Sequence, residues 1–333
     1  MSGFAPSGSN RIANNLTATR YVDTGLNSST IYYYLAEAVN SAGSSLPSNQ
    51  VMAAFGQDVT PPVIQCASPD QFWHASDVLI ACTASDSGSG LANSADASFL
   101  LTATVPAGTE TVNAATGTHQ VCDKAGNCAT AGPISGIMID KKPPSITITA
   151  PGASQYVLNQ GVPSSYSCAD SGSGLATCNG SVPNSTDFNT KVVGTASFAV
   201  SAGDNVGNTS NASVSYTVAY GQCPLYDPTK AAKSGSTIPI KLQLCDAQNT
   251  DVSAASVVLH VSNLVQTSTN ASLVVVDAGN ANPDNDFRFD PTLGPTGGYI
   301  FNLKTTGLST GTYELVFTAG SDPTTHIVYF QVR

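Results

Sequence analysis

The stretch Asp86-Ser-Gly-Ser-Gly-Leu-Ala92 decides the fold, because it returns unchanged as Asp170-Ser-Gly-Ser-Gly-Leu-Ala176, 84 positions later. A second stretch of sequence also recurs. Cys122-Asp-Lys-Ala-Gly-Asn127 corresponds to Gly203-Asp-Asn-Val-Gly-Asn208, 81 positions later. Recurrence at nearly one period indicates tandem copies of one structural unit. The period is too long for a helical solenoid repeat and suits a small β-sandwich.

A third recurring pair marks the start of each unit, since Pro61-Pro62 returns as Pro143-Pro144 after 82 positions. Between these anchors the chain lacks helical periodicity. Short alternating runs rich in Val, Ile, Thr, Tyr and Phe are separated by clusters of Gly, Pro, Asn, Asp and Ser, which is typical of all-β sandwiches. We therefore predict an all-β protein, built as an elongated array of tandem sandwiches.

The composition excludes several classes of partner. Of the 333 residues, only 10% are charged, and 12 Lys and Arg against 22 Asp and Glu give a net charge of −10. A negative field repels phosphate backbones and anionic lipid, so we expect no nucleic-acid partner. The chain has no run of about 20 apolar residues, so we expect no membrane insertion.

Eight cysteines fall into groups of four, two and two along the chain. An even number in each group indicates disulfides formed in an oxidising compartment, and hence an extracellular or cell-surface location. Zinc is the alternative, but its clustered ligand spacing is missing, and the four histidines are scattered. The predicted disulfide-forming residues are Cys66, Cys82, Cys122, Cys128, Cys168, Cys178, Cys223 and Cys245.

Residues 1–56 resemble the second half of a fibronectin type III domain. The motif Leu26-Asn-Ser-Ser-Thr-Ile-Tyr32 precedes an alternating run, with Ser28 where that family usually has Pro. The resemblance implies that the Tyr32 hydroxyl bonds back to upstream backbone, as a tyrosine corner. The strands that come first in that family are missing, and no signal peptide precedes the segment. We therefore expect the chain to be the C-terminal part of a longer protein.

Residues 57–140 (repeat 1) and 141–219 (repeat 2) resemble the Ig-like repeats of exported bacterial multi-domain proteins. The resemblance rests on the Pro-Pro start and on the two recurring motifs. Residues 220–333 (the C-terminal module) resemble the bacterial PxKF module. The matching residues are Pro239 and Lys241, with Leu242 in place of the family's Phe.

The Ig resemblance implies a pairing for the four cysteines of repeat 1. Cys82 and Cys122 occupy the places of the bridge between the two sheets, which leaves Cys66 with Cys128. In repeat 2 and the C-terminal module the cysteines come in single pairs. We expect Cys168–Cys178 to hold the loop between them, and Cys223–Cys245 to tie the start of the last module to its second strand.

Two groups of oxygen-bearing side chains are candidate calcium sites, because calcium favours clustered carboxylate and amide oxygens. Ordinary Asx turns are the alternative in both places. The first group alternates along one loop of the C-terminal module. The second needs the recurring loops of each repeat to converge. The candidate ligands are Asn280, Asn282, Asp284 and Asp286 in the first group, and Asp86 with Asp123 and Asp170 with Asp204 in the second.

Catalytic motifs are not convincing in this chain. The Gly307-Leu-Ser-Thr-Gly311 stretch matches the nucleophile motif of hydrolases, but it lies between two strand-like runs rather than before a helix. We expect a turn there and no enzymatic activity. Trp73 precedes a strand and is assigned to packing, with sugar stacking as the alternative.

Three functions fit these predictions. The first is a non-catalytic structural or adhesive stalk of a bacterial secreted or cell-surface protein. The second is an accessory region of a secreted enzyme, which targets or spaces a catalytic domain. The third is a glycan-binding module. We expect an extracellular glycan or protein as partner, and the open half-sandwich together with the low charge also favours self-association.

Overall fold

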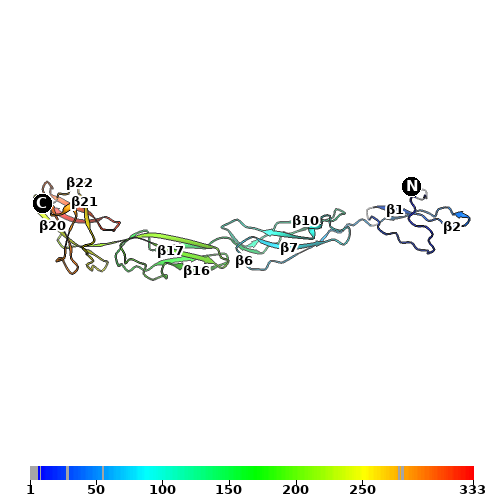
Figure 1. Ribbon diagram of the computed structural model, residues 1–333, viewed down its shortest axis with the longest axis horizontal. Coiled ribbons are helices and arrows are strands. Elements are labelled where there is room, and N and C mark those ends of the chain that lie inside the picture. Colours follow the sequence, from blue (N-terminus) through cyan, green and yellow to red (C-terminus); the bar gives the residue numbers. More distant parts are fainter. Residues whose placement is uncertain (1–6, 8, 28–29, 55, 277, 279–280) are drawn as a thin grey trace. The chain divides into compact units, whose positions relative to one another are not determined.

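The computed structural model describes the chain except residues 1–6, 8, 28–29, 55, 277 and 279–280 (Figure 1). Strands and turns make up the described residues. Their helical elements are two 3₁₀ turns, η1 (Ser94–Ala97) and η2 (Pro283–Asn285). Among the described residues, no helix has the length and apolar character needed to cross a membrane. The all-β prediction is confirmed. The chain forms two compact units, Met1–Lys141 and Lys142–Arg333.

The N-terminal segment, residues 1–56, has four short strands, β1 (Ile31–Tyr34), β2 (Val39–Asn40), β3 (Gly43–Ser44) and β4 (Val51–Ala54). β1 pairs with β4 and β2 with β3, both antiparallel. Tyr32 and Tyr34 share one face of β1, with ring centroids 6.5 Å apart. The Tyr32 hydroxyl accepts a hydrogen bond from the Asn27 amide (2.8 Å), as the tyrosine-corner resemblance implied. No described residue before Pro62 is buried, so this segment has no core of its own.

Repeat 1 contains three small sheets, with strand orders β5-β7-β8, β6-β12-β9 and β10-β11. β7 shows why the alternation predicts a half-buried strand: Ile80 and Cys82 point into the core, whereas Leu79 is exposed. Trp73 is half-buried in β6, where it pairs with Met138. The strands are β5 (Val63–Cys66), β6 (Trp73–His74), β7 (Val78–Ser85), β8 (Ser98–Ala103), β9 (Glu110–Ala114), β10 (His119–Cys122), β11 (Cys128–Ala131) and β12 (Ile137–Asp140).

The predicted cysteine pairing of repeat 1 is wrong. The disulfides are Cys66–Cys82 and Cys122–Cys128, with Cα–Cα distances of 4.0 and 4.1 Å. Both join residues that face each other on neighbouring antiparallel strands, β5 with β7 and β10 with β11. Each bond therefore lies within one sheet. The Ig analogy fails because register places each cysteine directly opposite its partner on the adjacent strand.

Repeat 2 forms a two-stranded sheet, β13-β15, and a four-stranded sheet, β14-β18-β17-β16. Figure 1 shows β16 alongside β17, the first strand of a long antiparallel hairpin with β18. Phe188, Phe198 and Tyr216 lie at the centre of the core, and Phe188 and Tyr216 have ring centroids 5.0 Å apart. The strands are β13 (Ser145–Ala150), β14 (Gln155–Val157), β15 (Ser165–Ala169), β16 (Leu175–Gly180), β17 (Gly194–Asp204) and β18 (Thr209–Ala219).

The Cys168–Cys178 disulfide of repeat 2 confirms the predicted pair, with a Cα–Cα distance of 5.9 Å. Cys168 belongs to β15 and Cys178 to β16. These strands belong to different sheets. The bond therefore joins the two sheets as well as closing the loop between the two cysteines.

The C-terminal module is a sandwich of two four-stranded sheets, β19-β20-β24-β23 and β22-β21-β25-β26. Its core is the largest of the three that the described residues form, with Leu242, Phe301 and Phe317 fully buried. The strands are β19 (Gly221–Pro224), β20 (Thr237–Cys245), β21 (Leu259–Gln266), β22 (Ala271–Leu273), β23 (Arg288–Asp290), β24 (Gly298–Lys304), β25 (Gly311–Ala319) and β26 (His326–Val332).

Pro239 and Lys241 lie in β20, opposite Asn302 and Ile300 of β24. The backbone amide and carbonyl of Asn302 hydrogen-bond outward to the Asn282 side chain, both at 3.0 Å. The Pro239–Asn302 pair therefore exchanges no backbone hydrogen bond, and the missing N–H of proline leaves this ladder intact.

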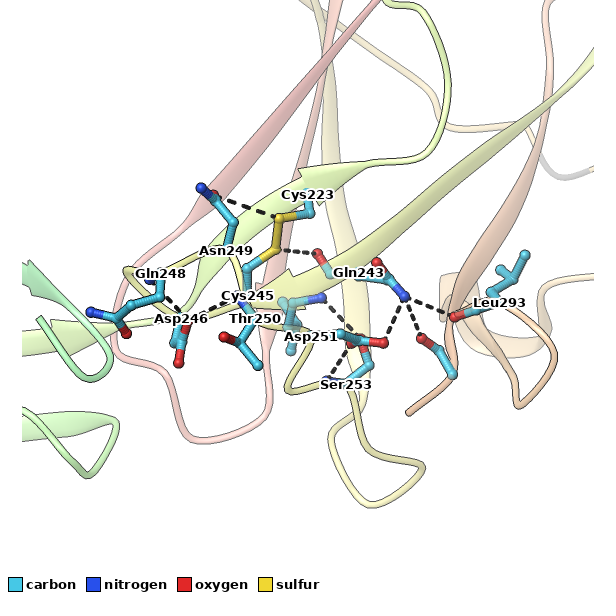
Figure 2. The surroundings of a disulfide bond; sticks show 12 residues. Cys223, Gln243, Cys245, Asp246, Gln248, Asn249, Thr250, Asp251, Ser253 and Leu293 are labelled. Carbon is cyan, nitrogen blue, oxygen red and sulfur yellow. Dashed lines mark hydrogen bonds between the residues drawn. A yellow bond between two sulfur atoms is a disulfide. The ribbon is translucent and has the colours of Figure 1, made fainter. Parts of the chain in front are cut away.

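Figure 2 shows the surroundings of the Cys223–Cys245 disulfide, whose Cα–Cα distance is 6.0 Å. Cys223 lies in β19 and Cys245 ends β20, so the predicted tie between the start of the module and its second strand is confirmed. Next to it, Gln243 Nε2 donates to Asp251 Oδ2 (2.6 Å) and to the Leu293 carbonyl (2.9 Å). The Gln243 side chain therefore links β20 to Asp251 and to the loop that contains Leu293.

Candidate functional site

The first recurring loop, which we name the SG loop, covers residues 86–92 in repeat 1 and 170–176 in repeat 2. Its aspartate anchors it in both copies. Asp86 Oδ2 accepts from the Gly88 and Gly90 amides, at 3.0 and 2.7 Å. In repeat 2 Asp170 Oδ2 accepts from the Gly174 amide at 2.8 Å. Gly90 and Gly174 have φ of 79° and 88°, which explains why the motif keeps glycine at this position.

The second recurring element, which we name the GN turn, covers residues 122–128 in repeat 1 and 203–209 in repeat 2. Asp123 is 2% exposed and Asp204 is 5% exposed. Asp123 accepts from the Asn127 amide (2.8 Å) and from its side chain (2.7 Å). Asp204 accepts from the Asn208 amide (2.8 Å) and side chain (2.6 Å). The two copies are therefore held by the same hydrogen bonds.

The SG loop and the GN turn contact each other in both repeats. The Lys124 amide donates to the Gly90 carbonyl at 2.9 Å, and the Asn205 amide donates to the Gly174 carbonyl at 3.0 Å. In repeat 1 the Ala125 amide also donates to Ser89 Oγ at 3.1 Å. The convergence of the loops that the second candidate calcium site requires is thus present, and backbone amides make these contacts.

Asp58 is the site residue that sequence reasoning missed. Carboxylate oxygens of Asp58, Asp86 and Asp123 all lie within 4.8 Å of one another, and we name these residues the carboxylate cluster. Hydrogen bonds from Thr60 and from the Ser89 amide hold the pKa of the Asp58 carboxyl well below its usual value. A signal existed: Asp58 stands three residues before Pro61, as Asp140 stands three residues before Pro143.

Three carboxylates this close concentrate negative charge, and hard oxygen donors of this kind suit calcium. Every member also serves the loops, because Asp58 accepts from Ser89, Asp86 from Gly90 and Asp123 from Asn127. Carboxylate oxygens have two lone pairs each, so these hydrogen bonds leave acceptor capacity for a cation. The residues of repeat 1 therefore fit a calcium ion, although the hydrogen bonds alone account for the folded loops.

In repeat 2 the corresponding residues, Asp170 and Asp204, do not belong to one such cluster. In the described part of this repeat, no group of three metal-ligating side chains contains both residues. Asn205 connects the two loops through its amide to Gly174, as Lys124 does in repeat 1, and also through its side chain to the Ser173 carbonyl (2.8 Å).

The candidate calcium loop of the C-terminal module folds as a turn in its described residues. Asn280 lies outside the described residues. Asn282 uses both ends of its amide on the Asn302 backbone, and Asp286 Oδ1 pairs with His260 Nδ1 at 2.7 Å. Asp284 has φ of 59°, as in a tight turn. These contacts favour the Asx-turn interpretation of residues 281–286.

Ser309 of the hydrolase-like motif lies in the connection between β24 and β25. Its Oγ contacts Gln266 Nε2 (3.1 Å) and the Tyr313 hydroxyl (3.3 Å). The predicted turn is present, rather than a strand-to-helix elbow. Each of the four histidines pairs with an aspartate, which orients its ring. The pairs are His74–Asp70, His119–Asp96, His260–Asp286 and His326–Asp322.

Comparison with known proteins gives no family and no curated relative that matches this chain. Among solved structures, it is similar to the extracellular cadherin domains 3–6 of protocadherin gamma B2, with a TM-score of 0.28 and 16% identity over 91% of this chain and 83% of that one. The eight N-terminal Ig domains of the Down syndrome cell adhesion molecule match with a TM-score of 0.29 and 11% identity, over 90% and 40%. Immunoglobulin domains 1–5 of Sidekick-1 match with 0.25 and 14%, over 92% and 67%.

These neighbours are themselves tandem arrays of Ig or cadherin domains. At such identities and TM-scores the likeness carries no argument about function.

Proposed function

We propose that this chain is a non-catalytic structural region, a spacer or adhesive stalk, of an exported protein. The observation that carries the proposal is that repeat 1, repeat 2 and the C-terminal module each have a separate core. Every disulfide joins two residues of the same module, so each module is cross-linked internally. Covalently cross-linked sandwiches with separate cores suit a protein that spaces or presents other groups.

An oxidising location supports the same proposal. All eight cysteines are paired and none is free. Disulfides persist in secreted and surface proteins, whereas the cytosol keeps thiols reduced. The resemblance of the repeats to those of exported bacterial proteins points in the same direction, towards a bacterial cell surface or secreted fraction.

Binding and activity measurements on the full chain test the proposal. We expect no hydrolysis across a panel of glycoside, ester and peptide substrates, and cooperative unfolding of the cores. Turnover of any substrate by the pure chain would overturn the non-catalytic assignment. Saturable binding on a glycan array would replace the spacer by a glycan-binding module, whereas binding to a purified surface protein would select adhesion.

We also propose that the carboxylate cluster of repeat 1 binds calcium and so stiffens the start of this repeat. A ligand that binds only the folded state raises stability, by about 2.7 kcal/mol at a hundredfold excess over Kd. We expect calcium to raise the melting temperature relative to chelator, and magnesium to do so less, because it accepts crowded protein oxygens poorly.

Asp123→Asn and Asp204→Asn form a matched pair for this test. Both remove a buried carboxylate from the same GN turn, but only Asp123 belongs to the carboxylate cluster. We expect Asp123→Asn to abolish the calcium response and Asp204→Asn to keep it. An unchanged melting temperature in calcium for the wild-type chain would leave the cluster as a purely structural element.

A further inference from the structure

One disulfide differs from the other three in exposure. Cys128 is the one exposed cysteine of the eight, all of which the structure describes. Its partner Cys122 is half-buried. In two of the other three disulfides one sulfur is fully buried, since Cys82 and Cys245 are each 1% exposed. Thiol–disulfide exchange needs access of the attacking thiolate to a sulfur atom, so the Cys122–Cys128 bond is the most open to exchange.

Repeat 2 contains the same turn without a disulfide. Gly203 and Thr209 occupy the positions of Cys122 and Cys128, and they face each other in the β17–β18 hairpin as the two cysteines do in β10–β11. The GN turn of repeat 2 is nevertheless closed, because the Asp204 amide donates to the Asn208 carbonyl at 3.1 Å.

The geometry of the two turns agrees closely. In repeat 1 the corresponding amide-to-carbonyl hydrogen bond, from Asp123 to Asn127, measures 2.9 Å. The glycines of the two turns, Gly126 and Gly207, have φ of 93° and 95°. The amide-to-carbonyl hydrogen bond with the SG loop is also present in both repeats, from Lys124 to Gly90 and from Asn205 to Gly174. The turn therefore forms through its own hydrogen bonds, and the Cys122–Cys128 bond is not required to shape it.

We propose that Cys122–Cys128 is a thiol-exchange site, which a low-molecular-weight thiol of the glutathione class opens and closes while repeat 1 stays folded. A thiolate of that class attacks Cys128 Sγ, the sulfur–sulfur bond breaks, and Cys122 leaves as a thiolate. A second thiolate of that class then attacks the small-molecule sulfur of the mixed disulfide, Cys128 leaves as a thiolate, and the oxidised small molecule is released, so both cysteines are reduced. Two electrons pass from the two small thiols to the protein disulfide.

The remaining disulfide of repeat 1 explains how the fold survives this step. Cys66–Cys82 joins β5 to β7, with Cys82 packed in the core. Exchange at Cys122–Cys128 leaves this bond, the carboxylate hydrogen bonds of the GN turn and the core in place. The turn then behaves as its counterpart in repeat 2 does.

The test titrates the full chain with mixtures of reduced and oxidised glutathione, followed by acid quench, alkylation and peptide mass spectrometry. We expect Cys122–Cys128 to open at a ratio of reduced to oxidised thiol at least about tenfold lower than the other three disulfides require. The near-ultraviolet circular dichroism should stay native at that ratio. Opening of another disulfide first, or loss of the native spectrum together with this bond, would overturn the proposal.

Two sets of variants keep the test independent of folding defects. Cys122→Ser and Cys128→Ser each leave one thiol, and we expect the exposed Cys128 to form a mixed disulfide with oxidised glutathione faster than the half-buried Cys122. Equal or reversed rates would contradict the assigned point of attack. The double variant Cys122→Gly/Cys128→Thr copies the residues of repeat 2, and we expect it to melt closer to wild type than Cys66→Ser/Cys82→Ser does. The opposite order would make the exposed bond a structural one.

Discussion

At the scale of single residues, the glycines of the SG loops show how backbone conformation fixes a sequence. Gly174 has φ of 88°, and a Cβ built there would meet Asn205 Nδ2 at 3.2 Å. Gly90 has φ of 79° and more room, with Lys124 Nζ at 3.8 Å. A side chain in the left-handed region costs about 1–2 kcal/mol. We expect Gly174→Ala to lower the free energy of unfolding by about that amount, and Gly90→Ala by slightly less.

Urea denaturation measures both changes. Gly117 provides the control, since a Cβ there would meet no atom within 4 Å and its φ is not positive. Gly117→Ala should be neutral or slightly stabilising, because alanine restricts the unfolded chain. Equal losses of unfolding free energy at all three positions would show that the positive φ is not the reason for glycine in the SG loops.

Asp58 gives a prediction for the dependence of stability on pH. The Thr60 hydroxyl is the largest cause of the lowered pKa of its carboxyl. A carboxyl whose pKa is depressed by folding stabilises the protein above its unfolded pKa, and this contribution is lost as the pH falls below about 4. We expect Thr60→Val to lower the melting temperature at neutral pH, and the difference from wild type to shrink on acidification. A difference that stays constant from neutral to acid pH would assign the loss to packing.

The sequence predicted the residues of the repeated loops but not all of their partners. Asp86 and Asp123 could be brought together because both belong to recurring motifs. Asp58 was missed because it precedes the first strand of repeat 1 and belongs to neither recurring motif. Asn282 and Asp286 were misleading, since the same residue types cap turns and bind calcium. Only their contacts with Asn302 and His260 distinguish the two uses.

At the scale of elements, three corners of the C-terminal module repeat the sequence Asp-Pro-Thr, beginning at Asp227, Asp290 and Asp322. In each corner the aspartate Oδ1 accepts from the threonine amide and hydroxyl, with hydroxyl distances of 2.6, 2.7 and 2.7 Å. Proline fixes the backbone between the two residues, so the corner ends or precedes a strand with little loss of entropy.

Burial decides how much each corner contributes to stability. The Asp322 side chain is fully buried, whereas Asp227 is exposed. Removing a hydrogen bond to a buried charged group costs about 1.5–3 kcal/mol. We expect Thr324→Val to destabilise the module by about that much, and Thr229→Val to stay within about 0.5 kcal/mol of wild type. Thermal unfolding of both variants measures these changes in stability. Equal destabilisation by the two substitutions would show that burial of the corner does not determine its contribution.

Strand positions were predictable because alternation reports burial directly, whereas strand neighbours were not. β7 alternates in this way, and its inward-facing Cys82 is in the core. The choice of Cys66 rather than Cys122 as its partner depends on which strand lies next to β7. The order of the strands in the sheet and their register decide this pairing. A single sequence does not determine either of them where no turn motif joins the two strands.

At the scale of the whole molecule, separate cores with internal disulfides predict stepwise unfolding under force. Repeat 1, repeat 2 and the C-terminal module should each rupture in an event of their own, because each buries its own side chains. The N-terminal segment should give no rupture event, since none of its described residues is buried. Single-molecule stretching of the full chain measures these events directly.

The contour length released in each rupture event, measured with and without reducing agent, tests the same prediction. A closed disulfide prevents the residues between its two cysteines from being stretched. The sequence separations are 16 and 6 in repeat 1, 10 in repeat 2 and 22 in the C-terminal module. At about 3.6 Å per residue, reduction should lengthen the three events by about 80, 36 and 80 Å. Increments that depart from this pattern would mean that the disulfides connect different residues under load. One cooperative rupture of the whole chain would instead show that the modules depend on one another, and the proposed spacer would lose its physical basis.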